Sequence, residues 1–255
     1  MSSYGLWLSA AGMKVNEHRQ TLLANNLANV QTAGFKKDLA VVMQRRVESQ
    51  SSPTGAAFVH PVLDDLAGGV HVRPSYQSWQ NGPIEWTGKP LDVAIQGDGL
   101  FTVQDGETTR YTRNGNFAVN SAGELVLATE SGRWRILDED GDPITLAEDG
   151  GEITISDDGM MRQGAEEVAR IEIVMTDNPR ALRKVGENLF ELTEGEMKPA
   201  AGRIEGQSLE GSNFDVVEGL AGMIEATRAY QMNATLIQLQ DQLTGQTVST
   251  LGRLA

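Results

Sequence analysis

The sequence predicts an α+β protein with a helix at each end and a central, mainly β body of irregular short strands. Three observations predict it. Residues 3–33 and 213–251 carry apolar side chains at helical spacing. The stretch between them alternates short apolar runs with turns that contain Gly, Asn and Asp. The 255 residues include 28 glycines and only 5% aromatic residues, which indicates many turns and a modest hydrophobic mass.

The first helix combines a thin apolar stripe with small residues, so another helix could approach it closely. Asn25, Asn26 and Asn29 are mediocre helix formers, and their presence predicts a polar face whose amides have a purpose. Gly34 is expected to close the helix in the left-handed conformation, with Lys36 near the negative end of the helix.

The second helix carries a seven-residue repeat, the spacing that keeps one face toward a partner in a coiled coil. The repeat consists of Met223, Tyr230, Ile237, Thr244 and Leu251. Ser212 and Asp215 form an imperfect capping box at its start, and Gly252 with Arg253 suits its end. Glycines within the helix make it marginal alone. The pattern allows two interpretations: both helices pack on the protein's own body, or they form a coiled coil shared between subunits.

The segments in between divide the chain into four parts. Residues 1–48 hold the first helix and the segment after it, residues 49–70 read as a linker, residues 71–210 form the β body, and residues 211–255 hold the second helix. Strands are expected over residues 91–95, 100–103, 109–112, 124–127, 153–155, 168–175 and 189–192, and around Ile204. Their spacing favours a β-sandwich or partial barrel over a parallel sheet.

Composition excludes several classes of function. No cysteine is present, so disulfides, thiolate metal sites and a cysteine nucleophile are excluded. A formal net charge of −14 argues against nucleic acid or anionic lipid as the main partner, because phosphates would be repelled. No stretch approaches the roughly 20 apolar residues that a membrane span needs.

No motif supplies a nucleophile, a base or a cofactor loop, so no enzymatic activity and no cofactor are predicted. The acidic run over residues 138–142 lacks the distal glutamate of a calcium loop and is interpreted as a hairpin turn. The histidines are scattered without the spacing of a zinc site. An alternative function is a secreted carbohydrate-binding or adhesive β module whose sugar groove is lined by Trp7, Trp79, Trp86 and Trp134, although core or subunit contact is the ordinary role of tryptophan.

Both ends of the chain and the start of its middle resemble the bacterial flagellar axial family, the rod and hook proteins. Residues 24–36 read Ala-Asn-Asn-Leu-Ala-Asn-Val-Gln-Thr-Ala-Gly-Phe-Lys and resemble the run that ends this family's first helix. Residues 212–230 resemble its closing segment, with Phe214 where Val is usual and Thr227 where Gln is usual. Residues 91–101 and 111–126 also resemble family motifs.

The resemblance implies a structural subunit of the flagellar basal-body rod that polymerises helically through paired terminal helices and transmits torque from motor to hook. The short body favours a rod protein over a hook protein, and its length fits the proximal and the distal rod type alike. Residues 212–215 and 129–205 look divergent from the distal type, which favours the proximal one. The implied partners are further copies of the chain, other axial proteins and the flagellar type III export apparatus, with no nucleic acid and no membrane insertion.

The implied location is the periplasmic rod, reached without a cleaved signal peptide. The N-terminal residues alone, which lack a basic stretch before a long apolar core, would instead predict the cytoplasm. The expected assembly contacts are Leu22, Asn26, Leu27 and Asn29 in the first helix and Met223, Ile224, Tyr230 and Ile237 in the second.

Overall fold

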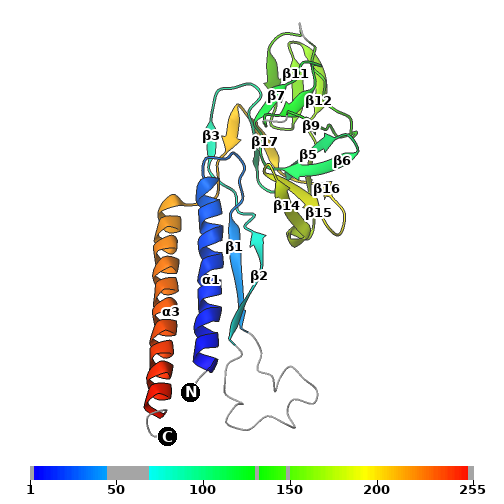
Figure 1. The fold of residues 1–255 in the computed structure, drawn as a ribbon. Helices are drawn as coiled ribbons and strands as arrows, with labels where there is room; N and C mark the ends of the chain where they lie inside the picture. Colours follow the sequence, from blue (N-terminus) through cyan, green and yellow to red (C-terminus); the bar gives the residue numbers. More distant parts are fainter. Residues whose placement is uncertain (1–2, 45–68, 130–131, 148–149, 252–255) are drawn as a thin grey trace. The chain divides into compact units, whose positions relative to one another are not determined.

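The computed structural model describes residues 3–44, 69–129, 132–147 and 150–251 (Figure 1). Most of the expected linker and the expected helix stop at Gly252 and Arg253 lie outside the described residues. The chain divides into two compact units. Unit 1 comprises residues 1–27, 38–76 and 215–255, and unit 2 comprises residues 28–37 and 77–214. The chain therefore passes between the units at four points, 27/28, 37/38, 76/77 and 214/215.

Unit 1 consists of two long helices and a two-stranded sheet. The helices are α1 (Ser3–Ala28) and α3 (Val216–Leu251), and the strands are β1 (Asp38–Gln44) and β2 (Val70–Gln77). Within this unit, α1 lies between α3 and the β1–β2 sheet (Figure 1). The start of α1 and the end of α3 lie at the same end of the helix pair (Figure 1).

The first helix is shorter than predicted, because it ends at Ala28 and not near residue 33. The chain continues into turns in which the Thr32 N–H donates to the Asn29 carbonyl at 3.1 Å. Gly34 does adopt the left-handed conformation, with φ of 65°, but it follows these turns and does not cap the helix directly. No basic residue lies in the last turn of α1, so the prediction that Lys36 serves the helix end is wrong.

The second helix follows its prediction closely, beginning three residues later than expected. Asp215 caps it, since its Oδ1 accepts the Glu218 N–H at 2.9 Å. The expected pairing of Ser212 with Asp215 is wrong, because Ser212 Oγ accepts the Phe214 N–H at 3.3 Å.

Unit 2 is a body of short antiparallel strands. Its largest sheet has the order β14-β15-β6-β5-β9-β8-β7, with β13 and β16 joined to it through β5. Its strands are β5 (Leu100–Asp105), β6 (Thr108–Thr112), β7 (Phe117–Val119), β8 (Leu125–Leu127), β9 (Arg135–Ile136), β13 (Ile173–Met175), β14 (Leu182–Gly186), β15 (Leu189–Leu192) and β16 (Lys198–Pro199). The antiparallel pairing confirms the preference against a parallel sheet.

Three smaller sheets complete the body. One contains β10 (Ile153–Ile155), β11 (Met160–Gln163) and β12 (Glu166–Arg170). The second pairs β4 (Val93–Gln96) with β17 (Arg203–Gly206), and the third pairs β3 (Ile84–Trp86) with β18 (Ser208–Glu210). A short 3-10 helix, η3 (Pro179–Ala181), precedes β14.

The hydrophobic core of unit 2 is built mainly by β4, β5 and β8, whose side chains are almost fully buried. Its largest cluster includes Ile95, Phe101, Leu125, Ile136 and Met161. The rings of Phe101 and Phe117 pack edge to face with centroids 5.1 Å apart. A chain with few aromatic residues thus forms a core from aliphatic side chains on short strands.

Candidate assembly site

The two helices of unit 1 run antiparallel along one close seam. A β-carbon added at Gly5 would lie 2.6 Å from Gln240 Nε2, and one added at Gly12 would lie 3.0 Å from Asn233 Oδ1. The second contact follows the first after seven residues in each helix, which is the spacing of a coiled coil. Further along, Gln20 Nε2 donates to Thr227 Oγ1 at 3.4 Å. Small residues on α1 therefore let the amide side chains of α3 come close.

Asn26 holds the end of α1 against the start of β1. Its Nδ2 donates to the Asp38 carbonyl at 2.9 Å, and its Oδ1 accepts the Asp38 N–H at 2.9 Å. The side chain is 2% exposed. An amide fits this position because it offers one donor and one acceptor to the same backbone residue. At Asn26, the polar helix face predicted from the asparagines therefore binds another segment of the same chain.

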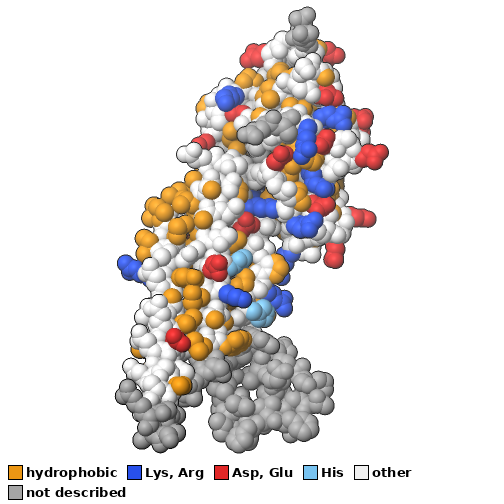
Figure 2. Space-filling view, in the orientation of Figure 1, with side chains coloured by type: hydrophobic (Ala, Val, Ile, Leu, Met, Phe, Trp, Pro, Cys, Tyr) orange, Lys and Arg blue, Asp and Glu red, His pale blue; other side chains and the backbone are white. Residues whose placement is uncertain are grey.

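The second helix has a further apolar face that points away from α1 and into solvent. Its exposed members form two runs, residues 217–224 and 232–243, and within each run they follow one another at intervals of three or four residues. The exposed Arg228 lies between the two runs. The two runs together are the outer ridge, which consists of Val217, Leu220, Ile224, Met232, Leu236, Leu239 and Leu243. Hydrophobic side chains gather along the helix pair in Figure 2, whereas charged side chains gather over the strands of unit 2. Isolated exposed apolar residues are ordinary, but two such runs along one side of a helix mark an interaction surface.

The residues expected to make assembly contacts fall into three groups. Ile224 belongs to the outer ridge and is 55% exposed. Met223, Tyr230 and Ile237, from the seven-residue repeat, are half-buried, as are Leu22, Leu27 and Asn29. Asn26 is buried within unit 1. The structure thus separates the predicted repeat from the outer ridge, which the sequence analysis did not single out.

Unit 2 contains a buried charge cluster formed by Lys36, Arg113 and Glu210, each at most 3% exposed. Lys36 Nζ lies 2.7 Å from Glu210 Oε1 and 2.9 Å from the Gln80 carbonyl oxygen. Arg113 Nε donates to Glu210 Oε2. The rest of the guanidinium donates to the carbonyls of Ile95, Gly97 and Gly99 and to Asn81 Oδ1.

The environment shifts both ends of the Lys36–Glu210 ion pair. Burial lowers the pKa of Lys36, and the attraction of Glu210 only partly opposes that effect. Burial by itself would raise the pKa of Glu210, but Arg113 and Lys36 together hold that pKa below its ordinary value. Glu210 is therefore stabilised as a carboxylate inside the body.

Glycines bring the backbone of the cluster together. A β-carbon added at Gly34 would lie 2.3 Å from the carbonyl carbon of Arg113, and one added at Gly82 would lie 2.1 Å from the Gly211 carbonyl oxygen. Asn213 joins the same segments, because its Oδ1 accepts the Lys37 N–H at 2.8 Å and its Nδ2 donates to the carbonyls of Ser78 and Gln80.

The sequence alone does not predict this cluster, although its residues stand in or beside the motifs that resemble the axial family. Lys36 ends the first motif, Arg113 lies within the motif over residues 111–126, and Glu210 lies two residues before the closing segment. The available signal was a charged residue in or beside each of these motifs. No spacing rule links positions so far apart, so their meeting required the fold.

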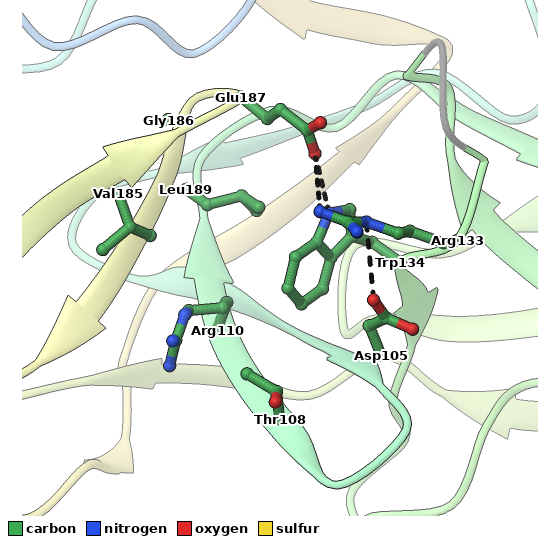
Figure 3. Close-up of a pocket in the computed structure, with 9 residues that line it drawn as sticks. All are labelled: Asp105, Thr108, Arg110, Arg133, Trp134, Val185, Gly186, Glu187 and Leu189. Carbon is green, nitrogen blue, oxygen red and sulfur yellow. Dashed lines mark hydrogen bonds and ion pairs between the residues drawn. The ribbon is translucent and has the colours of Figure 1, made fainter.

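Unit 2 has a surface hollow of about 370 Å³, lined by residues that include Arg133, Trp134 and Glu187 (Figure 3). Its polar groups bind one another: Trp134 Nε1 donates to Glu187 Oε2 at 2.8 Å, and Arg133 Nε lies 3.4 Å from Asp105 Oδ2. The Arg133 guanidinium also covers the Trp134 ring at 5.2 Å. The hollow is therefore a surface depression with internally satisfied polar groups and not a prepared binding site.

The four tryptophans have separate surroundings. Trp7 belongs to α1 in unit 1, Trp79 packs on Phe190 with ring centroids 5.0 Å apart, and Trp86 is 70% exposed on β3. Trp134 is buried and its indole N–H is occupied by Glu187. Nothing in these positions favours the sugar groove of the alternative function.

The acidic run over residues 138–142 forms the hairpin turn predicted for it. Asp138 Oδ1 accepts the N–H groups of Asp140 and Asp142 at 3.0 and 2.9 Å, and Gly141 has φ of 84°. In the described ranges, no helix has the length and apolar character needed to cross a membrane.

Comparisons with known proteins agree with the motifs. Residues 94–163 match the family model described as the flagellar hook protein FlgE/F/G D1 domain, and residues 205–250 match that described as the flagellar basal body rod FlgEFG protein C-terminal. The chain is 31% identical to the flagellar basal-body rod protein FlgG of Borreliella burgdorferi, over 94% of this chain and 96% of that protein.

Two proteins of Caulobacter vibrioides match at a similar level. Identity is 33% to its FlgF, over 91% of both chains, and 33% to its FlgG, over 92% of this chain and 94% of the relative. Both rod types thus match equally well, and the preference for the proximal type stays a prediction. The chain belongs to the flagellar basal-body rod protein family.

Proposed function

We propose that this chain is a structural subunit of the flagellar basal-body rod, with no catalytic role, and that it assembles helically through its terminal helices. The observation that carries the proposal is the outer ridge of α3, an unpaired apolar surface on a helix that already uses its opposite face against α1. A helix with two apolar faces is suited to contact a partner chain as well as its own. The named rod relatives support the same role.

The proposed contact joins unlike surfaces of identical chains. Subunits related by a rotation and a rise then form an open helical array, because the contact does not close on itself. The seven-residue spacing of the α1–α3 contacts supports a coiled coil as the unit that packs in the array. Leu22, Leu27, Asn29, Met223, Tyr230 and Ile237 are proposed to shape the pair, and Ile224 to contact a neighbour.

We further propose that the neighbours are other axial proteins, that the assembled chain lies in the periplasmic rod and transmits torque, and that it reaches this place through the flagellar export apparatus without a cleaved signal peptide. These points rest on the family. The exposed apolar faces of the helices fit assembly with other chains, because an unassembled chain leaves that apolar surface uncovered.

The proposal is tested by Leu239→Glu in the outer ridge. Leu239 is 50% exposed, so the change should leave the monomer folded. Burying an unpaired carboxylate in a subunit contact is strongly unfavourable, and we expect polymerisation at high protein concentration to be lost, together with motility in a strain lacking the native gene.

Gln238→Glu is the matched control. It introduces the same charge one residue earlier, about 100° around the helix from Leu239. The control should assemble and support motility. Normal assembly of the Leu239→Glu protein would contradict the proposed use of the ridge.

A further inference from the structure

The buried charge cluster joins the beginning, the middle and the end of the chain. Lys36 is 174 positions from Glu210, and Arg113 is 97 positions from it. Both Lys36 and Arg113 form an ion pair with the Glu210 carboxylate. Its Oε1 accepts from Lys36 Nζ and from the Gly82 N–H, each at 2.7 Å, while its Oε2 accepts from Arg113. Asp98 also acts on Lys36, but as the weakest of the charged influences.

The backbone around Glu210 closes the body in the same way. The Gly34 N–H donates to the Glu210 carbonyl at 2.6 Å, and the Asn213 N–H donates to the Phe35 carbonyl at 3.3 Å. Strands β17 and β18 of the same segment pair with β4 and β3. Residues 203–213 thus provide partners for the first segment of unit 2 and for the strands β3 and β4.

We infer that residues 203–213 act as a closing segment, and that unit 2 does not complete its folding until Glu210 binds Lys36 and Arg113. Without Glu210, the two cationic side chains of Lys36 and Arg113, which are 1% and 3% exposed in the folded protein, would be buried together with no carboxylate in contact. Leaving a buried charge uncompensated costs several kcal/mol, a large part of the stability of a typical domain. A chain that has not yet supplied its last fifth would therefore remain unfolded.

A purely local role for Glu210 makes a different prediction. If the cluster only fastened residues 34–37 to residues 208–213, its loss would loosen those two segments and leave the central strands protected. If Glu210 closes the body, its loss should destabilise β4, β5, β6, β17 and β18 together. Hydrogen exchange of backbone amides separates the two cases.

The experiment uses the full-length chain and Glu210→Gln, which keeps the size of the side chain and removes its charge. We expect exchange protection to fall by about a hundredfold or more, and by a similar factor in all five strands. The matched control is Glu191→Gln. Glu191 also meets two arginines, Arg110 at 3.3 Å and Arg183 at 2.7 Å, but on the surface, so its loss should change protection by less than about fivefold.

Loss of protection confined to residues 34–37 and 208–213 would overturn the inference. Should Glu210→Gln fail to fold, Glu210→Asp decides the matter, because it keeps the charge on a side chain one methylene shorter. We expect the aspartate variant to recover the near-ultraviolet circular dichroism of the native protein at pH 7. An aspartate variant as unfolded as the glutamine variant would show that the carboxylate charge does not close the body.

Discussion

At the scale of residues, side-chain amides bind backbone groups of other segments, and glycines let backbone segments pack closely. Asn26 binds both polar groups of Asp38, and Asn213 binds three backbone groups from two segments. Gly34 leaves room for the backbone of Arg113. The unusual asparagines could be recognised in the sequence, but their partners could not, because a backbone group has no signature of its own.

Gly34→Ala should be strongly destabilising. Alanine in the left-handed conformation costs about 1–2 kcal/mol. The new methyl group would also lie 2.3 Å from backbone atoms of Arg113, which cannot move without disturbing the buried charge cluster. We expect a large fall in the urea unfolding midpoint of the full-length protein.

Gly141→Ala provides the comparison for this prediction. Gly141 has a similarly positive φ of 84°, but no neighbouring atom lies within 4 Å of an added β-carbon. Its substitution should therefore carry only the conformational cost. Equal midpoints for the two variants would mean that the close approach at Gly34 has no energetic weight.

At the scale of elements, the helices and strands with a clear hydrophobic pattern in the sequence could be predicted, and those without one could not. The last helix was predicted to within three residues, because a long repeat with a capping aspartate leaves little choice. The strands around Ile95, Phe101 and Phe190 were also predicted, since each is a short apolar run between turns. Strands such as β3 and β18 were missed, because they are three residues long and owe their conformation to each other.

The helix pair allows a prediction about two glycines of α3. Glycine lowers helix stability by up to about 1 kcal/mol relative to alanine. A β-carbon at Gly222 would meet Leu23 at an ordinary distance of 3.4 Å, and one at Gly245 would meet nothing within 4 Å. Gly222→Ala and Gly245→Ala should each raise the thermal unfolding midpoint of the helical signal by a few degrees.

Gly5→Ala serves as the contrasting variant, because its methyl group would lie 2.6 Å from Gln240 Nε2. It should gain less than the other two or lose stability. A lower midpoint for Gly222→Ala would mean that the helices cannot tolerate an ordinary methyl contact at this point of the seam.

At the scale of the whole molecule, the two units are interleaved along the sequence. Unit 1 takes residues from the beginning and the end of the chain, and unit 2 takes two stretches that alternate with those of unit 1. A chain with a helix toward each end of the sequence and a β body between them could be predicted from periodicity. The buried charge cluster could not, because it depends on three positions that only the completed fold brings together.

The cluster predicts how stability depends on pH. The pKa of Glu210 is lower in the folded protein than its ordinary value, so the unfolded chain takes up the proton first on acidification. Stability from this group is present above the unfolded pKa of about 4.3 and is lost as the pH falls through the folded pKa. We expect the urea unfolding midpoint to drop between pH 5 and pH 3.

Two features separate this effect from general electrostatics. The net charge is −14, and acidification relieves that repulsion, which would stabilise the protein. The contribution of a buried pair is also screened little by salt, so the drop should persist in about 0.5 M sodium chloride. A midpoint that rises or stays constant down to pH 3 would contradict the role assigned to Glu210.

The four crossings of the chain between the units have a mechanical consequence. A force applied to unit 1 reaches unit 2 through four backbone segments in parallel, at 27/28, 37/38, 76/77 and 214/215. No one of these segments is indispensable as a tether, because a break at any crossing leaves the units joined by others. Two domains in series on a single linker would be separated by one cut, whereas here the topology of the chain itself provides redundancy.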